Sequence, residues 1–180
     1  NQAMESKVSE VRQYSRQLVR ELDLVKGSYL DTGYTFSQCH VLFELSVNKT
    51  LNLLALAENL LIDKSNTSRT VKQLVKLGLV RAETVASDNR QKLLSLTAKG
   101  KQALQATIHL ANKQVEAALG ILSEEQQELV VQGVQLYADA LKKSRLQSNF
   151  TIRSIQKRDN SQVAGLIRTV MTEFSAVGAG

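Results

Sequence analysis

The spacing of hydrophobic positions changes twice between residues 56 and 97, and these changes predict a helix-turn-helix followed by a β-hairpin. A short apolar-patterned helix is expected to end near Asn59, and Asp63 can cap the free backbone amides of a second helix. In the second helix, positions at i, i+4, i+7 and i+8 predict one buried stripe. Its members are Thr67, Val71, Leu74 and Val75.

The face opposite this stripe is cationic and carries Ser65, Arg69, Lys72 and Lys76. Hydroxyl and amide groups gather at its N-terminal end, which is where a recognition helix enters the major groove of DNA. They belong to Ser65, Asn66 and Ser68. The alternative is an ordinary solvated helix face, which would be the commoner outcome for a lone basic helix.

The segment after this helix predicts a two-stranded wing. Gly78 is expected to end the helix in the left-handed conformation. Two strand-like runs, LVRAETVA and KLLSLT, flank the polar segment SDNRQ, which predicts a turn with a positive tip. Arg90 and Lys92 could reach an adjacent minor groove, whereas Asp88 would orient an arginine or cap the turn. An ordinary polar hairpin tip is the alternative.

Positive charge is concentrated in this region. Residues 64–92 hold seven basic and two acidic residues, a balance of +5, compared with +6 for the whole chain. A cationic surface on the predicted recognition helix and wing favours double-stranded DNA as the partner. The predicted DNA contacts are Lys64, Ser65, Asn66, Ser68, Arg69, Lys72, Lys76, Arg90 and Lys92.

Composition narrows the class of protein further. The 180 residues are 43% hydrophobic, which is enough for one domain with a sizeable core and an appendage. No apolar run approaches the roughly 18 residues of a membrane span, and no export signal is recognised, so a cytoplasmic protein is expected. The single cysteine excludes an intramolecular disulfide. Residues 1–3, before Met4, are interpreted as an expression remnant.

Amphipathic helices are expected on both sides of the DNA-binding region. The first seam comprises Val8, Val11, Ser15, Leu18, Leu22 and Val25. The second comprises Leu104, Ile108, Ala111, Val115, Ala118 and Leu122. A capping box at Ser123–Gln126 predicts a further helix through Leu141. By the pattern alone these helices could form an intramolecular bundle or an interface between two chains.

Five segments in order resemble the MarR family of winged-helix transcriptional regulators: YTFSQCHVLFEL, TLNLLALAENL, DKSNTSRTVKQLVKLGLV, SDNRQKLLSLT and TAKGKQAL. The resemblance covers residues 5–146. It implies a mainly α fold with a small β-hairpin wing, in a domain at 4–146 with a DNA-binding core at 35–97. Helices at 5–25 and 98–145 would form a homodimer.

The same resemblance implies a function and roles for individual residues. Residues 64–72 would be the recognition segment, Arg90 the wing arginine and Asp88 its support. The dimer would bind a pseudo-palindromic operator and release it when a small effector binds between the dimerisation helices and the DNA-binding lobe. Candidate effector contacts are Tyr14, Tyr34, His40 and Phe43, although aromatic residues at such spacing are more often part of the core.

The neighbouring residues Cys39 and His40 raise the question of catalysis. A capping box at Thr35–Gln38 places both in the first turn of a helix. Adjacent helical positions point about 100° apart, so the two cannot form a nucleophile and base pair by themselves. With no second cysteine to resolve an oxidised thiol, simple packing is favoured over redox sensing. We therefore expect no catalytic residues and no metal site.

The C-terminal segment 147–180 changes character. After a polar linker, residues 151–174 predict a short strand followed by an amphipathic helix that Asp159 caps. This pair resembles the first strand and helix of a GNAT-type N-acetyltransferase. No glycine-rich pyrophosphate loop follows, so this chain is expected not to be an enzyme, and acetyl-CoA would bind only with the missing remainder of that domain. The alternative function is therefore the DNA-binding half of a bifunctional regulator and acetyltransferase. A third interpretation of the C-terminal segment is a helix that docks on the DNA-binding domain.

Overall fold

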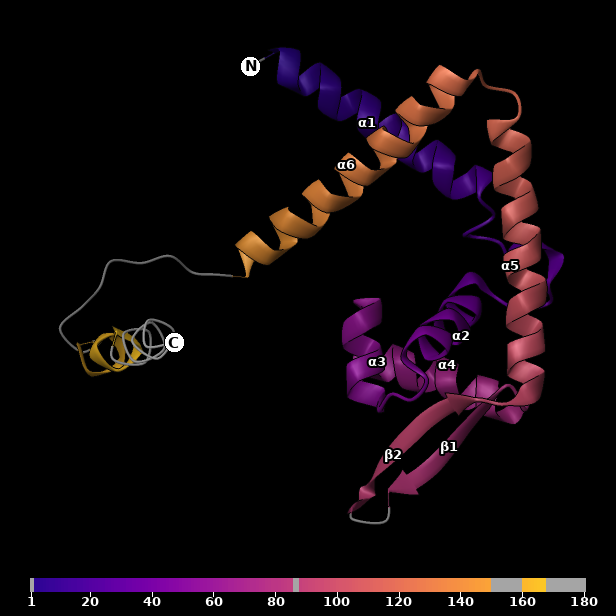
Figure 1. The fold of residues 1–180 in the computed structure, drawn as a ribbon, viewed down its shortest axis with the longest axis vertical. Helices are drawn as coiled ribbons and strands as arrows, with labels where there is room; N and C mark the ends of the chain where they lie inside the picture. Colours follow the sequence, from indigo (N-terminus) through magenta and orange to yellow (C-terminus); the bar gives the residue numbers. More distant parts are fainter. Residues whose placement is uncertain (1, 86–87, 150–159, 168–180) are drawn as a thin grey trace, which may run out of the picture. The chain divides into compact units, whose positions relative to one another are not determined.

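The computed structural model describes residues 2–85, 88–149 and 160–167, with the backbone alone at residues 88–90. The chain divides into two compact units, Asn1–Leu122 and Ser123–Gly180 (Figure 1). The first unit contains all of the predicted DNA-binding elements. Its elements are α1 (Gln2–Glu21), a 3₁₀ turn at Tyr29–Asp31, α2 (Phe36–Asn48), α3 (Leu53–Leu60), α4 (Lys64–Lys76), β1 (Val80–Val85), β2 (Asp88–Leu96) and α5 (Ala98–Leu119).

Polar side chains fix the starts of the helices around the core. Thr35 accepts a hydrogen bond from the backbone of Gln38, whose side chain in turn accepts from the Thr35 backbone, so the predicted capping box is confirmed. Asp63 caps α4 by accepting from the backbone amide of Asn66, as predicted. Asn52 and Thr97 cap α3 and α5 in the same way. Each cap satisfies an amide that has no partner within the helix.

The core of the first unit lies where α2, α3, α4 and the hairpin meet. Its most deeply buried apolar side chains are Val41, Leu42, Leu45, Leu56, Leu74 and Leu79. Three of the four residues of the predicted α4 stripe are buried. Val75 is the exception, with 41% of its surface exposed, because it lines a groove instead of the core.

The hairpin pairs β1 and β2 antiparallel, with Val80 opposite Leu96 and Thr84 opposite Lys92. A register shift follows at Thr84/Val85, where Val85 pairs with Asp88. The prediction that the second strand begins at Lys92 is wrong, because the strand already begins at Asp88. The apolar alternation starts later than the backbone ladder, because main-chain hydrogen bonds form the ladder whatever the polarity of the side chains.

The junction between α4 and α5 holds the recognition helix in place. Gly78 has φ 74°, which confirms the predicted left-handed end of α4. The Thr97 hydroxyl donates to the Gly78 carbonyl at 2.6 Å, and the Lys99 ammonium donates to the Leu77 carbonyl at 3.0 Å. Gly100 lies so close to the connection between α4 and β1 that a Cβ there would be 2.0 Å from the Leu79 carbonyl oxygen. The start of α5 is thus fastened to the end of α4.

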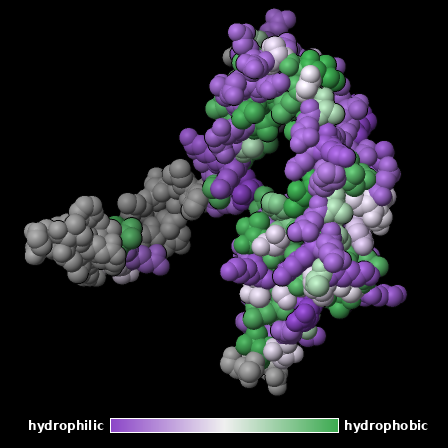
Figure 2. Space-filling view, turned by 45° about the vertical axis from the view of Figure 1, so that its right-hand side comes forward, coloured by the Kyte–Doolittle hydropathy of each residue, from purple (hydrophilic) through white to green (hydrophobic). Residues whose placement is uncertain are grey.

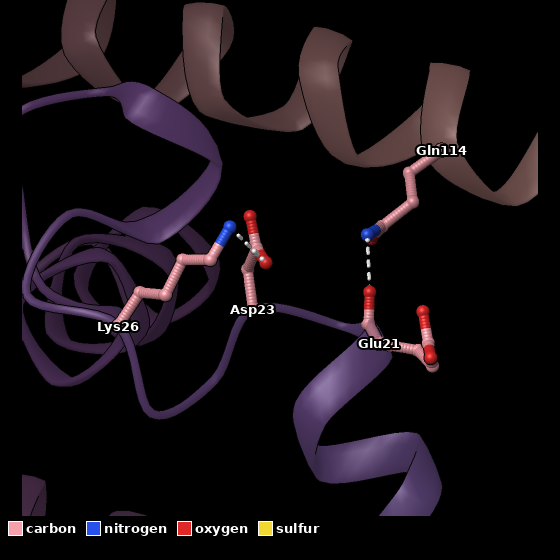
Figure 3. A network of polar contacts seen from close by, with 4 residues as sticks. All are labelled: Glu21, Asp23, Lys26 and Gln114. Atoms are coloured by element: carbon pink, nitrogen blue, oxygen red, sulfur yellow. Dashed lines mark hydrogen bonds and ion pairs between the residues drawn. The ribbon is translucent and has the colours of Figure 1, made fainter.

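Helix α1 ends at Glu21, so Leu22 and Val25 both lie outside it and the predicted seam extends four residues too far. The chain leaves the helix through Asp23, which has φ 61° and forms an ion pair of 2.9 Å with Lys26 (Figure 3). The Gln114 side chain of α5 donates at 3.0 Å to the Glu21 carbonyl, which has no helical partner (Figure 3). This contact attaches the end of α1 to α5.

The second unit begins with α6 (Glu124–Ser148), which starts at the predicted capping box of Ser123 and Gln126 and runs seven residues past its predicted end. A further helix spans residues 160–167. The strand predicted from Thr151 and the cap predicted at Asp159 lie outside the described residues. In the parts of the chain that the structure describes, no helix is both long and apolar enough to cross a membrane.

Candidate nucleic-acid interface and effector cavity

Helix α4 presents a polar, cationic face to solvent. All but one of the predicted α4 contacts are exposed, and Ser68 is half-buried. The exposed ones are Lys64, Ser65, Asn66, Arg69, Lys72 and Lys76. The opposite face is anchored in the core by Thr67, Val71 and Leu74. A short helix held on one side and bearing exposed hydroxyl, amide and cationic groups on the other fits the major groove.

Grooves flank α4 on both sides. Toward the wing, Lys64, Lys72 and Lys92 line a groove of about 600 Å³ whose apolar lining includes Leu54 and Val75. Toward α2, a groove of about 360 Å³ is lined by residues that include Ser37, Asn66, Arg69 and Gln73. The three lysines on the wing side come from α4 and β2, so the fold gathers positive charge from two separate elements. Such convergence suits the phosphate backbone of a nucleic acid.

The N-terminus of α4 carries an organised acidic cap. Both the backbone amide and the side-chain amide of Asn66 donate to the Asp63 carboxylate. These hydrogen bonds, the backbone bond first, hold the pKa of Asp63 below its ordinary range. The cap engages one N–H of the Asn66 side-chain amide, so the second N–H and the carbonyl oxygen can meet a base edge or a phosphate-bound water.

Among the wing side chains that the structure describes, Lys92 adds a positive charge to this face. Lys92 is exposed on β2 and lies in register with Thr84. Arg81, which counted toward the basic balance, pairs with Glu83 at 3.2 Å on the same strand. Asp88 and Arg90 belong to the backbone of β2, and their side chains lie outside the described residues. Their roles as wing support and wing arginine stay predictions.

A separate cavity of about 300 Å³ lies between α2, α5 and the 3₁₀ turn. Of the four predicted effector contacts, His40 and Phe43 line it. Tyr14 and Tyr34 do not: Tyr14 is 59% exposed on α1, and Tyr34 packs against the core. The other lining residues are Tyr29, Phe36, Cys39, Leu104, Thr107, Ile108, Ala111 and Asn112.

The pattern analysis missed Tyr29 and Phe36, which form the aromatic end of the cavity. Their rings meet edge to face with centroids 5.2 Å apart. Phe36 also lies 5.4 Å from the His40 ring, tilted by 35°. Phe36 directly follows the Thr35 cap, so the sequence could have placed it in the first turn of α2, beside Cys39 and His40. Tyr29 lies in a connection with positive φ at Leu30 and Asp31, whose path no periodicity encodes.

Cys39 lies in the wall of this cavity and is 4% exposed. Its Sγ is 3.8 Å from the Thr107 hydroxyl of α5. Burial raises the pKa of the thiol, outweighing the hydrogen bonds from Thr107 and Thr32. Burial and a raised pKa both lower the reactivity of a thiol, and the packing role that the sequence pattern favoured stays a prediction. Among the described residues, no group of three or more His, Cys, Asp or Glu side chains could hold a metal ion.

Comparison with known proteins agrees with this geometry. Residues 32–91 match the MarR family. The chain is 38% identical over 81 residues to the transcriptional regulator HosA of Escherichia coli O157:H7, an alignment that covers 45% of this chain. It spans 60% of the length of HosA. The resemblance to MarR-type regulators drawn from the five sequence segments is therefore supported by an independent match.

Solved structures share the fold. BpsR of Bordetella bronchiseptica, described for the regulation of its DNA binding by 6-hydroxynicotinic acid, aligns with a TM-score of 0.59 at 18% identity over 73% of this chain and 98% of BpsR. The MepR–DNA complex of S. aureus aligns with a TM-score of 0.58 at 20% identity over 74% of this chain and 96% of MepR. The fold is mainly helical with a two-stranded antiparallel wing, that of the MarR winged helix-turn-helix regulators, as predicted.

Proposed function

We propose that this chain is a DNA-binding transcriptional regulator that acts as a homodimer on a pseudo-palindromic operator. The observation that carries the proposal is the exposed cationic face of α4 beside a groove where Lys64 and Lys72 meet Lys92 of the wing. With α4 in the major groove, the wing would follow the adjacent backbone and minor groove. The family match at residues 32–91 and the fold shared with the MepR–DNA complex support this reading.

Exposed hydrophobic side chains support the dimer. Neither α1 nor α6 has a buried residue, although both helices carry many apolar ones. Figure 2 shows hydrophobic side chains at the surface among hydrophilic ones. The exposed apolar side chains of these two helices include Val8, Val11, Tyr14 and Leu18 of α1, and Leu129, Val131, Val134, Leu136 and Leu141 of α6. Apolar surface on this scale favours a second chain as its cover, and two-fold symmetry would pair the recognition helices.

The aromatic cavity is proposed as the effector site. It combines a volume within the range of ligand pockets with aromatic walls and a few polar groups. DNA binding by BpsR, which has the same fold, is regulated by 6-hydroxynicotinic acid. A ligand wedged between α2 and α5 would act on the helices that hold α4, because α2 contacts α4 and α5 is fastened to the end of α4.

Selection of bound fragments from random duplex DNA, with analytical ultracentrifugation of the protein, tests the proposal. We expect a dimer and inverted repeats whose half-site centres lie about 10 to 11 base pairs apart. Selected sequences without dyad symmetry, or a monomer at micromolar concentration, would contradict it.

The acetyltransferase interpretation of the C-terminal segment stays a sequence-based prediction. The helix at residues 160–167 agrees with the expected helix, but a single amphipathic helix is specific to no fold. The relatives reported above are similar to the DNA-binding part of the chain, which both alternatives contain, and HosA is a transcriptional regulator. Calorimetric titration with acetyl-CoA tests this point, and we expect no saturable binding to this chain.

A further inference from the structure

The wing-side groove of α4 combines cations with exposed apolar side chains. Val75 of α4 is 41% exposed, and Leu54 of α3, which lines the same groove, is 56% exposed. The α4 residues that line the groove follow one line along the helix, at i, i+4, i+7, i+8 and i+11. They are Lys64, Ser68, Val71, Lys72 and Val75. The line thus presents cationic, hydroxyl and apolar groups in turn, and packing in the core does not account for the apolar side chains that stay exposed.

The two elements that border the groove indicate what passes through it. The proposed function places α4 in the major groove of a duplex and the wing in the adjacent minor groove. A major groove and the minor groove beside it are separated by one sugar–phosphate strand. That strand must therefore pass between α4 and the hairpin, where Lys72 of α4 and Lys92 of β2 line the groove.

The charges of the groove match a strand of this kind. Lys64 and Lys72 are eight residues apart on α4, which corresponds to about 12 Å along the helix axis. Successive phosphates of one strand are about 3.4 Å apart along the duplex axis, so the two lysines can reach different phosphates. Lys92 adds a third ammonium group from β2. Among the described residues that line the groove there is no aspartate or glutamate to oppose these cations.

Phosphate groups alone would leave the apolar part of the groove uncovered. Between its phosphates a DNA strand exposes deoxyribose rings, in which the C2′ atom carries only hydrogen. These carbon atoms can cover Leu54 and Val75 and so remove apolar surface from water. A ribose would place its 2′-hydroxyl group against the same surface, where a hydroxyl without a hydrogen-bond partner is costly.

We propose that one sugar–phosphate strand of the duplex occupies the wing-side groove, with the lysines on its phosphates and Leu54 and Val75 against its deoxyribose rings. These two residues select deoxyribose over ribose at the sugars that they contact. The inference rests on the proposed function, because it names the part of the DNA that this groove binds and the residues that recognise its sugars.

An isosteric substitution separates the apolar contact from the charge contacts. Val75→Thr keeps the shape of the side chain and adds a hydroxyl group, so it should weaken the binding of selected duplex DNA by at least about 3-fold. The dependence of affinity on salt should not change in this variant. Lys72→Met removes a charge and should reduce the slope of log K against log salt by about 0.9. Fluorescence anisotropy between about 50 and 200 mM salt measures both quantities.

A scan with single ribonucleotides tests the sugar contact directly. Each deoxyribonucleotide of the selected duplex is replaced in turn by its ribonucleotide, at equivalent positions of both half-sites. We expect at least one position at which the parent protein binds at least about 3-fold more weakly. At that position Val75→Thr should lose less affinity than the parent, because the threonine hydroxyl can meet the 2′-hydroxyl group. A scan without such a position would overturn the proposal.

The matched control is Val47→Thr on α2. Val47 is also a helical valine, is 64% exposed and lines neither groove beside α4. This variant should keep the affinity, the salt dependence and the ribonucleotide profile of the parent. If Val75→Thr does not fold, Leu54→Asn in the same groove replaces it, with the same expected loss.

The outcomes distinguish this inference from the proposed function. Unchanged affinity in the folded groove variant, or an equal loss in Val47→Thr, would overturn the inference while DNA binding by the parent stands. A parent protein that binds no duplex DNA at all would overturn the proposed function and the inference with it.

Discussion

The side chain of Gln38 joins the start of α2 to the recognition helix. Its amide nitrogen donates to the side-chain oxygen of Gln73 on α4 at 3.2 Å, while its own oxygen accepts from the Thr35 backbone at 2.9 Å. One residue thus completes the cap of α2 and contacts α4. Because Phe36, Cys39 and His40 around it line the aromatic cavity, Gln38 lies between the proposed effector site and the proposed DNA-binding face.

The bond between Gln38 and Gln73 should be measurable as an interaction energy. We expect Gln73→Ala to lower the free energy of unfolding by about 0.5 to 1 kcal/mol, and Gln38→Ala to lower it further because the capping box is also lost. The double variant should show a non-additive term of about 0.5 kcal/mol or more in urea denaturation. Strict additivity would mean that the two side chains do not interact in solution.

Arg69 and Arg90 should differ in how they affect DNA recognition. Arg69 is exposed on α4, where an arginine can read base edges, so Arg69→Ala should cost about 1 to 3 kcal/mol on selected DNA and much less on a scrambled duplex. Arg90→Ala in the wing should weaken both duplexes alike. Fluorescence anisotropy at fixed salt measures the four affinities. Equal losses on both duplexes for Arg69→Ala would contradict its role as a base reader.

The Asp63 cap should make stability depend on pH on the acid side. Hydrogen bonds from Asn66 lower the pKa of the folded carboxyl group, so its contribution is complete above the unfolded value of about 3.9 and is lost as the pH falls through the folded value. Asp63→Asn keeps a capping side chain without the charge. The stability difference between the parent and this variant should therefore shrink from pH 6 to pH 3 in urea titrations. A constant difference would show that the carboxylate is not preferentially stabilised.

Gly100 and Gly133 form a matched pair of helical glycines. A Cβ at Gly100 would meet the Leu79 carbonyl oxygen at 2.0 Å, so Gly100→Ala should destabilise the chain by about 1 to 3 kcal/mol by forcing α5 away from the connection between α4 and β1. At Gly133 of α6 nothing lies within 4 Å of the added atom. Gly133→Ala should therefore be neutral or stabilise by up to about 1 kcal/mol. Denaturant unfolding decides both values, and similar effects at the two positions would contradict the close approach of α5.

Cys39 should react slowly with thiol reagents. Burial raises its pKa and limits access, so alkylation by iodoacetamide at pH 7.5 should be much slower in the folded chain than in urea. Cys39→Ser should leave the response of DNA binding to peroxide unchanged. A parent protein that leaves DNA under peroxide while the variant stays bound would instead establish a redox role.

Local sequence determined those features that depend on a few neighbouring residues. The caps at Thr35 and Asp63 and the helix end at Gly78 agree with the structure, because each is a hydrogen bond or backbone conformation within one turn. The basic face of α4 could also be predicted from the sequence, since helical periodicity alone assigns Arg69 and Thr67 to different faces.

Tertiary structure decided what depends on distant segments. The aromatic cavity brings Tyr29 together with Asn112, and no periodicity relates these positions, so the sequence pattern did not single out Tyr29 or Phe36 as lining residues. Val75 follows the apolar spacing of α4 yet remains exposed in a groove, because burial depends on what packs against a face. Periodicity identifies which side chains share a face, but the path of the connecting segments determines which faces meet.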